Sequence, residues 1–143
     1  MVELGAYRGA TCAALAPLTR RTYVAVDPYV GYGGGDRDLA RLRERIAGLS
    51  NVVHERATSG AAARAWRHGP VSFLFVDAAH DFVDTAFDLA VWEPLCAPGA
   101  VVALHDTDSR AYAGTRLAVW RYARRARLLA HVDGLVVLER PPG

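Results

Sequence analysis

Short apolar runs alternate with amphipathic stretches along the whole chain of 143 residues, and this alternation constrains the fold more than any other feature. Short apolar runs are typical of buried strands, whereas apolar residues at three- and four-residue spacing predict helices. Strands and helices that alternate in this way are typical of a parallel sheet with helices on both faces. We therefore expect an α/β fold of the doubly wound, Rossmann-like type.

The expected elements follow from where these runs begin and end. Strands are predicted at Val2–Leu4, Tyr23–Val26, Val52–Glu55, Val71–Val76, Ala100–Leu104, Arg127–His131 and Leu135–Glu139. Helices are predicted at Thr11–Leu18, Asp36–Leu49, Gly60–Arg67, Phe82–Leu95 and Ala111–Arg125. The dipeptide Pro98-Gly99 is expected to stop the fourth helix before the next strand. Asp133-Gly134 is typical of a tight hairpin turn, so the sheet should be seven-stranded and mostly parallel with a C-terminal antiparallel β-hairpin.

Composition narrows the class of protein. Hydrophobic residues make up 52% and charged residues 22%, which is typical of a globular chain, and the length fits a single domain over residues 1–143. All 17 basic residues are arginines. Without lysine the chain can have neither a Walker-type phosphate loop nor a Tyr-x-x-x-Lys dehydrogenase pair, so the glycine-rich segment 31–35 is expected to be an ordinary flexible connection.

The charge distribution argues against nucleic acid and membrane partners. The net charge is only +2, and the one local basic cluster is expected to be a solvated helix face (Arg121, Arg124, Arg125 and Arg127). No apolar stretch is long enough to span a membrane, and the N-terminus has no secretory signal pattern. We expect a cytoplasmic protein that binds neither nucleic acid nor membrane.

Isolated cysteines and tryptophans are expected in the core. Cys12 and Cys96 have no metal-binding spacing, which favours reduced side chains in apolar surroundings. Trp66, Trp92 and Trp120 lie in apolar helical patterns, and such tryptophans more often pack in a core than form a ligand platform.

The turn after the first strand has the features of a nucleotide-cofactor site. Gly5 and Gly9 have no Cβ, so the backbone can approach a ligand closely. Asp27 ends the next apolar run, where a carboxylate accepts hydrogen bonds from both ribose hydroxyls; the alternative is a helix cap. A nicotinamide-dependent oxidoreductase shares these features, but Tyr7 stands in place of a third glycine and the C-terminal hairpin is not typical of that class.

Several motifs together resemble one family. The segment Glu3-Leu4-Gly5-Ala6-Tyr7-Arg8-Gly9 resembles the first motif of metal-dependent O-methyltransferases related to catechol methyltransferase. Further matches to bacterial small-molecule and sugar O-methyltransferases of the methyltransferase 24 family are Phe75-Val76-Asp77-Ala78-Ala79-His80, Asp88, Trp92, Pro94-Leu95, Pro98-Gly99-Ala100 and His105-Asp106. The resemblance spans about the first 110 residues. It implies a class I methyltransferase that uses S-adenosylmethionine.

The resemblance implies roles for the residues around the cofactor. Glu3 would anchor the methionine ammonium, or make a structural hydrogen bond to loop amides. Thr11 would bind the methionine carboxylate or cap a helix, and Thr58 and Ser59 would hold the adenine or cap the following helix. Asp27 would bind the ribose.

The remaining cofactor contacts would come from the turn and from the fourth strand. Gly5, Tyr7 and Gly9 form the turn that leaves room for the cofactor. Asp77 follows the fourth strand and is expected to line the same site.

The reactive end would combine four polar residues after the fourth and fifth strands, where open α/β sheets bind ligands. Asp77 and Asp106 are suitable ligands for a divalent ion that deprotonates and orients the acceptor hydroxyl, with His105 as third ligand. Mg²⁺ is the first expectation, although His105 in place of an acid leaves room for another ion or none. His80 is the expected base. A polar rim of caps and backbone contacts is the alternative for all four.

The expected reaction is O-methylation of a small hydroxylated metabolite or a natural-product sugar. Related enzymes carry a helical segment before the first strand, which this sequence does not show. Either the native chain is longer or a homodimer covers the gap, and a non-catalytic or truncated methyltransferase-fold binding module is the competing reading.

Overall fold

A computed structural model describes residues 1–31 and 34–140. Its strands are β1 (Val2–Leu4), β2 (Tyr23–Val26), β3 (Val52–Glu55), β4 (Val71–Val76), β5 (Cys96–Leu104), β6 (Arg127–Val132) and β7 (Leu135–Glu139). Over the described residues these form a sheet of seven strands in the order β3-β2-β1-β4-β5-β7-β6. The predicted doubly wound sheet is therefore confirmed. The glycine-rich segment 31–35 includes residues 32–33, which lie outside the described part.

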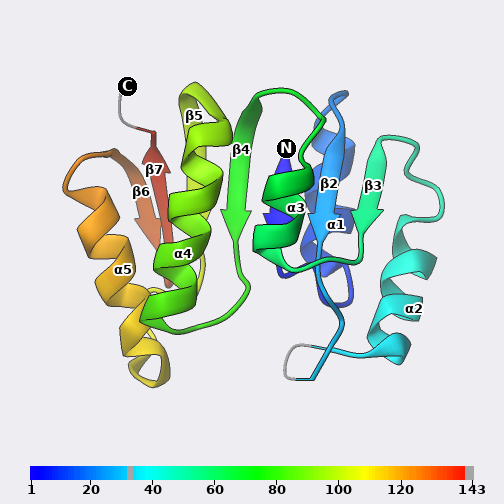
Figure 1. Cartoon of the computed structure of the whole chain (residues 1–143), viewed down its shortest axis with the longest axis horizontal. Coiled ribbons are helices and arrows are strands. Elements are labelled where there is room, and N and C mark those ends of the chain that lie inside the picture. The colour runs from blue at the N-terminus through cyan, green and yellow to red at the C-terminus, as the bar shows by residue number, and fades with distance from the viewer. Residues whose placement is uncertain (32–33, 141–143) are drawn as a thin grey trace.

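Helices cover both faces of the sheet (Figure 1). They are α1 (Ala10–Leu15), α2 (Asp36–Ile46), α3 (Ser59–Ala65), α4 (Phe82–Trp92) and α5 (Ala113–Ala123). In Figure 1, α3, α4 and α5 lie in front of the sheet, and α1 lies behind it. The alternation of side chains along a strand divides the core between the two faces. In β2, Val24 and Val26 pack with the front helices, whereas Tyr23 and Ala25 pack with α1 and α2.

Strand direction follows the prediction. The neighbours β3, β2, β1, β4 and β5 are parallel, and β7 is antiparallel to both β5 and β6. Asp133 and Gly134 connect the hairpin with φ of 44° and 78°. These left-handed conformations are typical of the tight turns that match the twist of a hairpin.

Proline shortens two of the predicted helices. The helix predicted at Thr11–Leu18 is α1 followed by a 3₁₀ turn at Ala16–Leu18, which contains Pro17. The helix predicted at Phe82–Leu95 ends at Trp92, before a 3₁₀ turn that contains Pro94. A proline has no N–H for the α-helical hydrogen bond, and its ring clashes with the preceding turn, so the α-helix ends there.

The other helix ends differ by a few residues. The second helix ends at Ile46 instead of Leu49, the third spans Ser59–Ala65, and the last begins with a 3₁₀ turn at Arg110–Tyr112 and ends at Ala123. Such terminal turns fray or tighten, and pattern alone does not locate them.

The dipeptide Pro98-Gly99 lies within β5 and does not separate a helix from a strand. The strand starts at Cys96, four residues before the predicted start, and its register against β4 shifts between Val71 and Phe73. Gly99 has a φ of 72°. A left-handed glycine inside a strand is typical of a bulge, which accommodates the extra residues. The sixth strand is one residue longer than predicted and ends at Val132.

The burial of the cysteines agrees with the prediction, and that of the tryptophans agrees in part. Cys12 and Cys96 are buried free thiols, and Trp92 is fully buried. Trp120 is 62% exposed on α5, so its predicted placement in the core was wrong. This helix keeps only one face on the sheet, and Trp120 projects from another.

The arginine cluster predicted to be solvated lies at the C-terminal end of α5 and the start of β6, and none of its four residues is buried.

The part of the chain that the structure describes has no helix long and apolar enough to cross a membrane.

Candidate active site

The turn between β1 and α1 brings two distant parts of the backbone together. Gly5 has a φ of 88°, and a Cβ on it would lie only 2.1 Å from the carbonyl oxygen of Asp77. Gly9 also has a left-handed φ, of 73°, and a Cβ there would lie 3.0 Å from Leu42. Packing against backbone therefore requires glycine at position 5, whereas at position 9 the left-handed φ favours glycine. Of the two, only Gly5 lines the cavity described below.

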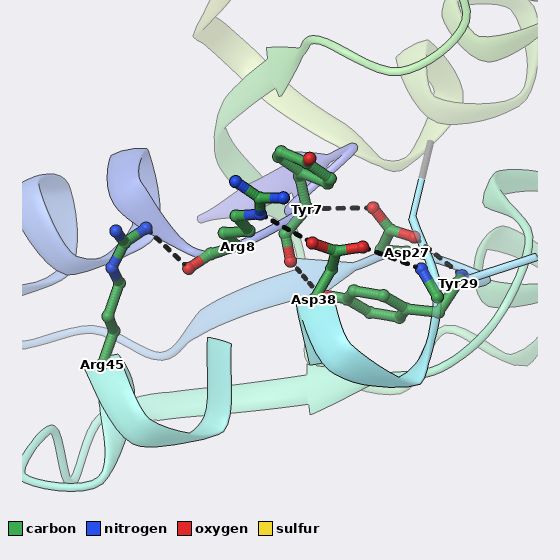
Figure 2. A network of polar contacts seen from close by, with 7 residues as sticks. Tyr7, Arg8, Asp27, Tyr29, Asp38 and Arg45 are labelled. Atoms are coloured by element: carbon green, nitrogen blue, oxygen red, sulfur yellow. Dashed lines mark hydrogen bonds and ion pairs between the residues drawn. The ribbon is translucent and has the colours of Figure 1, made fainter. Parts of the chain in front are cut away.

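Asp27 holds this turn against the end of β2 (Figure 2). One carboxylate oxygen accepts a hydrogen bond from the Tyr7 amide at 2.9 Å, and the other accepts one from the Tyr29 amide at 2.8 Å. The hydroxyl of Tyr29 in turn donates to the Tyr7 carbonyl at 2.5 Å. Each carboxylate oxygen keeps a further lone pair. Asp27 can therefore fix the turn and still accept two ligand hydroxyls.

A second contact ties the turn to α2. The guanidinium of Arg8 forms an ion pair with Asp38 at 2.6 Å, and Arg45 donates to the Arg8 carbonyl at 2.9 Å. In Figure 2, Asp38 lies between Arg8 and Asp27, and Arg45 lies on the other side of Arg8. Two residues of α2 thus hold the turn: Asp38, near the beginning of the helix, and Arg45, near its end.

Glu3 is buried in the core and does not line the cavity. The residue is 1% exposed, and its carboxyl accepts a hydrogen bond from the Tyr23 hydroxyl at 3.0 Å. Burial raises the pKa of Glu3 to about 8, and the nearby Asp77 and Asp27 add to this effect. The observed contact is a structural hydrogen bond, although its donor is a side chain and not a loop amide.

Thr11 also lies away from the cavity. It belongs to the first turn of α1, where the N-cap is Gly9 and no side chain caps the helix. The expected capping bond is therefore absent from this described turn.

Thr58 and Ser59 line the cavity at the start of α3. The Thr58 hydroxyl accepts from the Ala61 amide at 3.3 Å and caps the helix. Ser59 accepts from Trp92 Nε1 at 2.8 Å and interacts with the buried Asp88. Burial raises the pKa of Asp88 to about 6, although the hydrogen bond from Ser59 opposes the shift. Thr58 therefore caps α3, as one of the two alternatives predicted. Ser59 is held in place by Trp92 and Asp88.

The ends of β4 and β5 bring four polar residues together. Nδ1 of His105 lies 3.3 Å from Oδ1 of Asp77 and 3.4 Å from Oδ1 of Asp106. Nδ1 of His80 lies 3.5 Å from Oδ2 of Asp106, and the His80 ring stacks on Tyr112 with their centroids 4.3 Å apart. Burial raises the pKa of Asp77, while the neighbouring imidazoles oppose the shift.

The same cluster has the donor set for a divalent ion. Asp77, His80 and Asp106 each offer a ligand atom, and these atoms lie within 4.8 Å of one another. Nδ1 of His105 is buried and has no hydrogen-bond partner among the described residues. Carboxylates beside an unpaired imidazole nitrogen fit a metal ion.

One cavity of about 790 Å³ joins the two halves of the site. Nine of the residues predicted from the sequence line it: Gly5, Tyr7, Asp27, Thr58, Ser59, Asp77, His80, His105 and Asp106. Glu3, Gly9 and Thr11 do not. The cavity can therefore take an elongated ligand that reaches from the turn to the acidic cluster.

Asp88 and Phe87 are among the residues of the cavity wall that sequence reasoning missed. Asp88 was noted only as part of a motif, although its spacing before Trp92 on one helix face was a usable signal. Phe87 is 46% exposed and lies so close to Gly60 that a Cβ there would be 2.9 Å from its ring. No sequence pattern indicates that α3 and α4 meet at this point.

Comparison with known proteins agrees with this geometry. Residues 2–107 match the model of the Methyltransf_24 family, which is described as a methyltransferase domain. A search among curated protein sequences found no match.

Solved structures with the same fold include several methyltransferases. N-methyltransferase NodS from Bradyrhizobium japonicum, in complex with S-adenosyl-L-homocysteine, is 14% identical with a TM-score of 0.73, over 99% of this chain and 77% of that one. CalS11, a TDP-rhamnose 3′-O-methyltransferase of calicheamicin biosynthesis, is 18% identical with a TM-score of 0.74; the match covers 97% of this chain and 70% of that one. An O-methyltransferase from Bacillus cereus, in complex with S-adenosylhomocysteine, is 19% identical with a TM-score of 0.74; the match covers 97% of this chain and 72% of that one.

Proposed function

The chain belongs to the methyltransferase domain family whose model matches its residues 2–107, and on that premise we propose an S-adenosylmethionine-dependent O-methyltransferase that acts on a small hydroxylated metabolite. The observation that carries the proposal is the single cavity that joins the glycine turn and Asp27 to the cluster of Asp77, His80, His105 and Asp106. One end suits a nucleoside, and the other end suits a hydroxyl that must lose its proton.

Asp27 and the turn form the cofactor end. The carboxylate of Asp27 would accept hydrogen bonds from the ribose hydroxyls with the lone pairs that the Tyr7 and Tyr29 amides leave free. Thr58 and Ser59 lie where the adenine would follow. The methionine part would then extend past Tyr7 and Gly5 toward Asp77.

His80 would act as the base. As the acceptor oxygen forms its bond to the methyl carbon and the carbon–sulfur bond breaks, the hydroxyl proton passes to the imidazole. The stacking on Tyr112 holds the ring beside the cavity. A divalent ion bound by Asp77, Asp106 and His105 would lower the pKa of the hydroxyl and fix its angle of attack.

A sugar or similar polyol is the proposed acceptor class. A carboxylate-lined end with half-buried imidazoles suits a polar hydroxylated ring better than an apolar one. CalS11, which has the same fold, is a TDP-rhamnose 3′-O-methyltransferase, and the acceptor of that protein is thus a sugar.

Calorimetric titration with S-adenosylhomocysteine tests the cofactor part. We expect the purified chain to bind it, and Asp27→Asn to weaken binding by about tenfold or more, because two hydrogen bonds to the ribose lose their charged acceptor. Glu44→Gln, an exposed carboxylate on α2, is the control and should bind like the parent. No binding by the parent chain would contradict the proposal.

A further inference from the structure

A buried nitrogen faces two carboxylates at the ends of β4 and β5. Nδ1 of His105 lies 3.3 Å from Asp77 and 3.4 Å from Asp106, yet it makes no hydrogen bond among the described residues. Buried polar atoms are almost always paired in native proteins. The two carboxylates contact this nitrogen at ion-pair distance, and neither contact within the described residues has the geometry of a good hydrogen bond.

The separations of His105 from the two carboxylates fit neighbouring ligands of one ion. When nitrogen and oxygen ligands lie about 2.1 Å from a metal, neighbouring ligands are about 3.0 Å apart in octahedral geometry and about 3.4 Å apart in tetrahedral geometry. The two contacts of His105 are close to these values. An ion bound there would use the Nδ1 lone pair of a neutral imidazole.

The ligand types decide the class of ion. Mg²⁺ prefers carboxylates and water, and an imidazole in place of a carboxylate removes one negative charge from its site. Imidazole nitrogen instead suits first-row transition ions, whose affinity for mixed nitrogen and oxygen sites exceeds that of hard ions. From this we infer, on the basis of the proposed function, that Asp77, His105 and Asp106 bind a first-row transition-metal ion such as Mn²⁺, Fe²⁺, Co²⁺ or Zn²⁺ in preference to Mg²⁺.

His80 lies within reach of the same ion but is assigned a different role. Its Nδ1 has one contact to a carboxylate, at 3.5 Å, where His105 has two shorter ones. Its ring also stacks on Tyr112. His105 is therefore the nitrogen ligand, and His80 remains available to the acceptor.

Titration with Co²⁺ and Mg²⁺ tests the inference on the full chain without cofactor. We expect Co²⁺ to bind at least about tenfold more tightly than Mg²⁺, with visible absorption bands displaced from those of the aqueous ion. His105→Asp should remove most of this preference and shift the bands. His131→Gln, an exposed histidine on β6, controls for adventitious surface binding and should leave both unchanged. His105→Asn is the second variant if His105→Asp loses the parent circular dichroism.

Two results would overturn the inference. One is equal affinity for the two ions. The other is a set of Co²⁺ bands that respond to His80→Gln and not to the His105 variants.

S-Adenosylhomocysteine titration on the same sample separates the two proposals. Cofactor binding without Co²⁺ binding would refute the metal site alone. Co²⁺ binding without cofactor binding would refute the methyltransferase proposal and leave the metal site supported.

Discussion

The carboxyl group of Glu3 lies in the core, where it accepts a hydrogen bond from the Tyr23 hydroxyl. This buried carboxyl group makes the free energy of unfolding depend on pH. Its pKa rises from an ordinary 4.5 to about 8 in the folded protein. The folded chain therefore keeps this proton at pH values where the unfolded chain has lost it. The resulting stabilisation is complete below about pH 4.5 and is lost as the pH rises toward 8.

Urea unfolding of the parent chain and Glu3→Gln across pH 5 to 9, a range of about four units around the shifted pKa, measures this effect. The free energy of unfolding of the parent should fall with pH relative to that of the variant, since glutamine is neutral throughout. Parallel curves for the two proteins would show that Glu3 does not titrate in this range.

At the residue scale, the predicted site residues divide by the direction of their side chains. Asp27, Asp77 and His105 follow strand ends, where the fold class alone places them at the ligand edge. Glu3 lies within β1, and alternation sends its side chain into the core beside Tyr23. The interaction of Ser59 with Asp88 depends on how α3 packs against α4, which no local pattern encodes.

At the scale of elements, α4 begins with a side-chain cap. The carboxylate of Asp81 accepts a hydrogen bond from the Asp84 amide at 2.8 Å. Asp81→Ala should lower the free energy of unfolding by about 1 kcal/mol, because an amide of the first turn loses its acceptor. Asp81→Asn retains an oxygen acceptor and is the matched control. Equal losses in the two variants would point to the charge and not to the cap; chemical denaturation gives both values.

The boundaries of elements were predicted well where an apolar run stops abruptly. Five of the strands begin and end where the sequence indicates, because polar residues, turns or glycines flank them. The exceptions have specific causes. Pro17 and Pro94 convert the last turns of two helices to 3₁₀ geometry. Gly99, with its left-handed φ, is accommodated as a bulge, so β5 continues through a dipeptide that elsewhere would end a strand.

For the whole molecule, the sheet order follows from the alternation of elements and the hairpin signal together. Parallel neighbours need helical crossovers, and the sequence supplies them between the first five strands. The exposure of Trp120 could not be predicted in the same way, because an apolar helix pattern does not reveal how much of the helix the sheet covers.

The near contact of Gly5 with the carbonyl of Asp77 has a thermodynamic consequence. The backbone that would cradle the cofactor touches the residue whose carboxylate would bind the ion, so a shift of one end displaces the other. We therefore expect the two ligands to be coupled. Co²⁺ should change the affinity for S-adenosylhomocysteine, and S-adenosylhomocysteine should change the affinity for Co²⁺ by the same factor. Paired calorimetric titrations measure both factors. If each factor equals one, the two ends of the cavity respond independently.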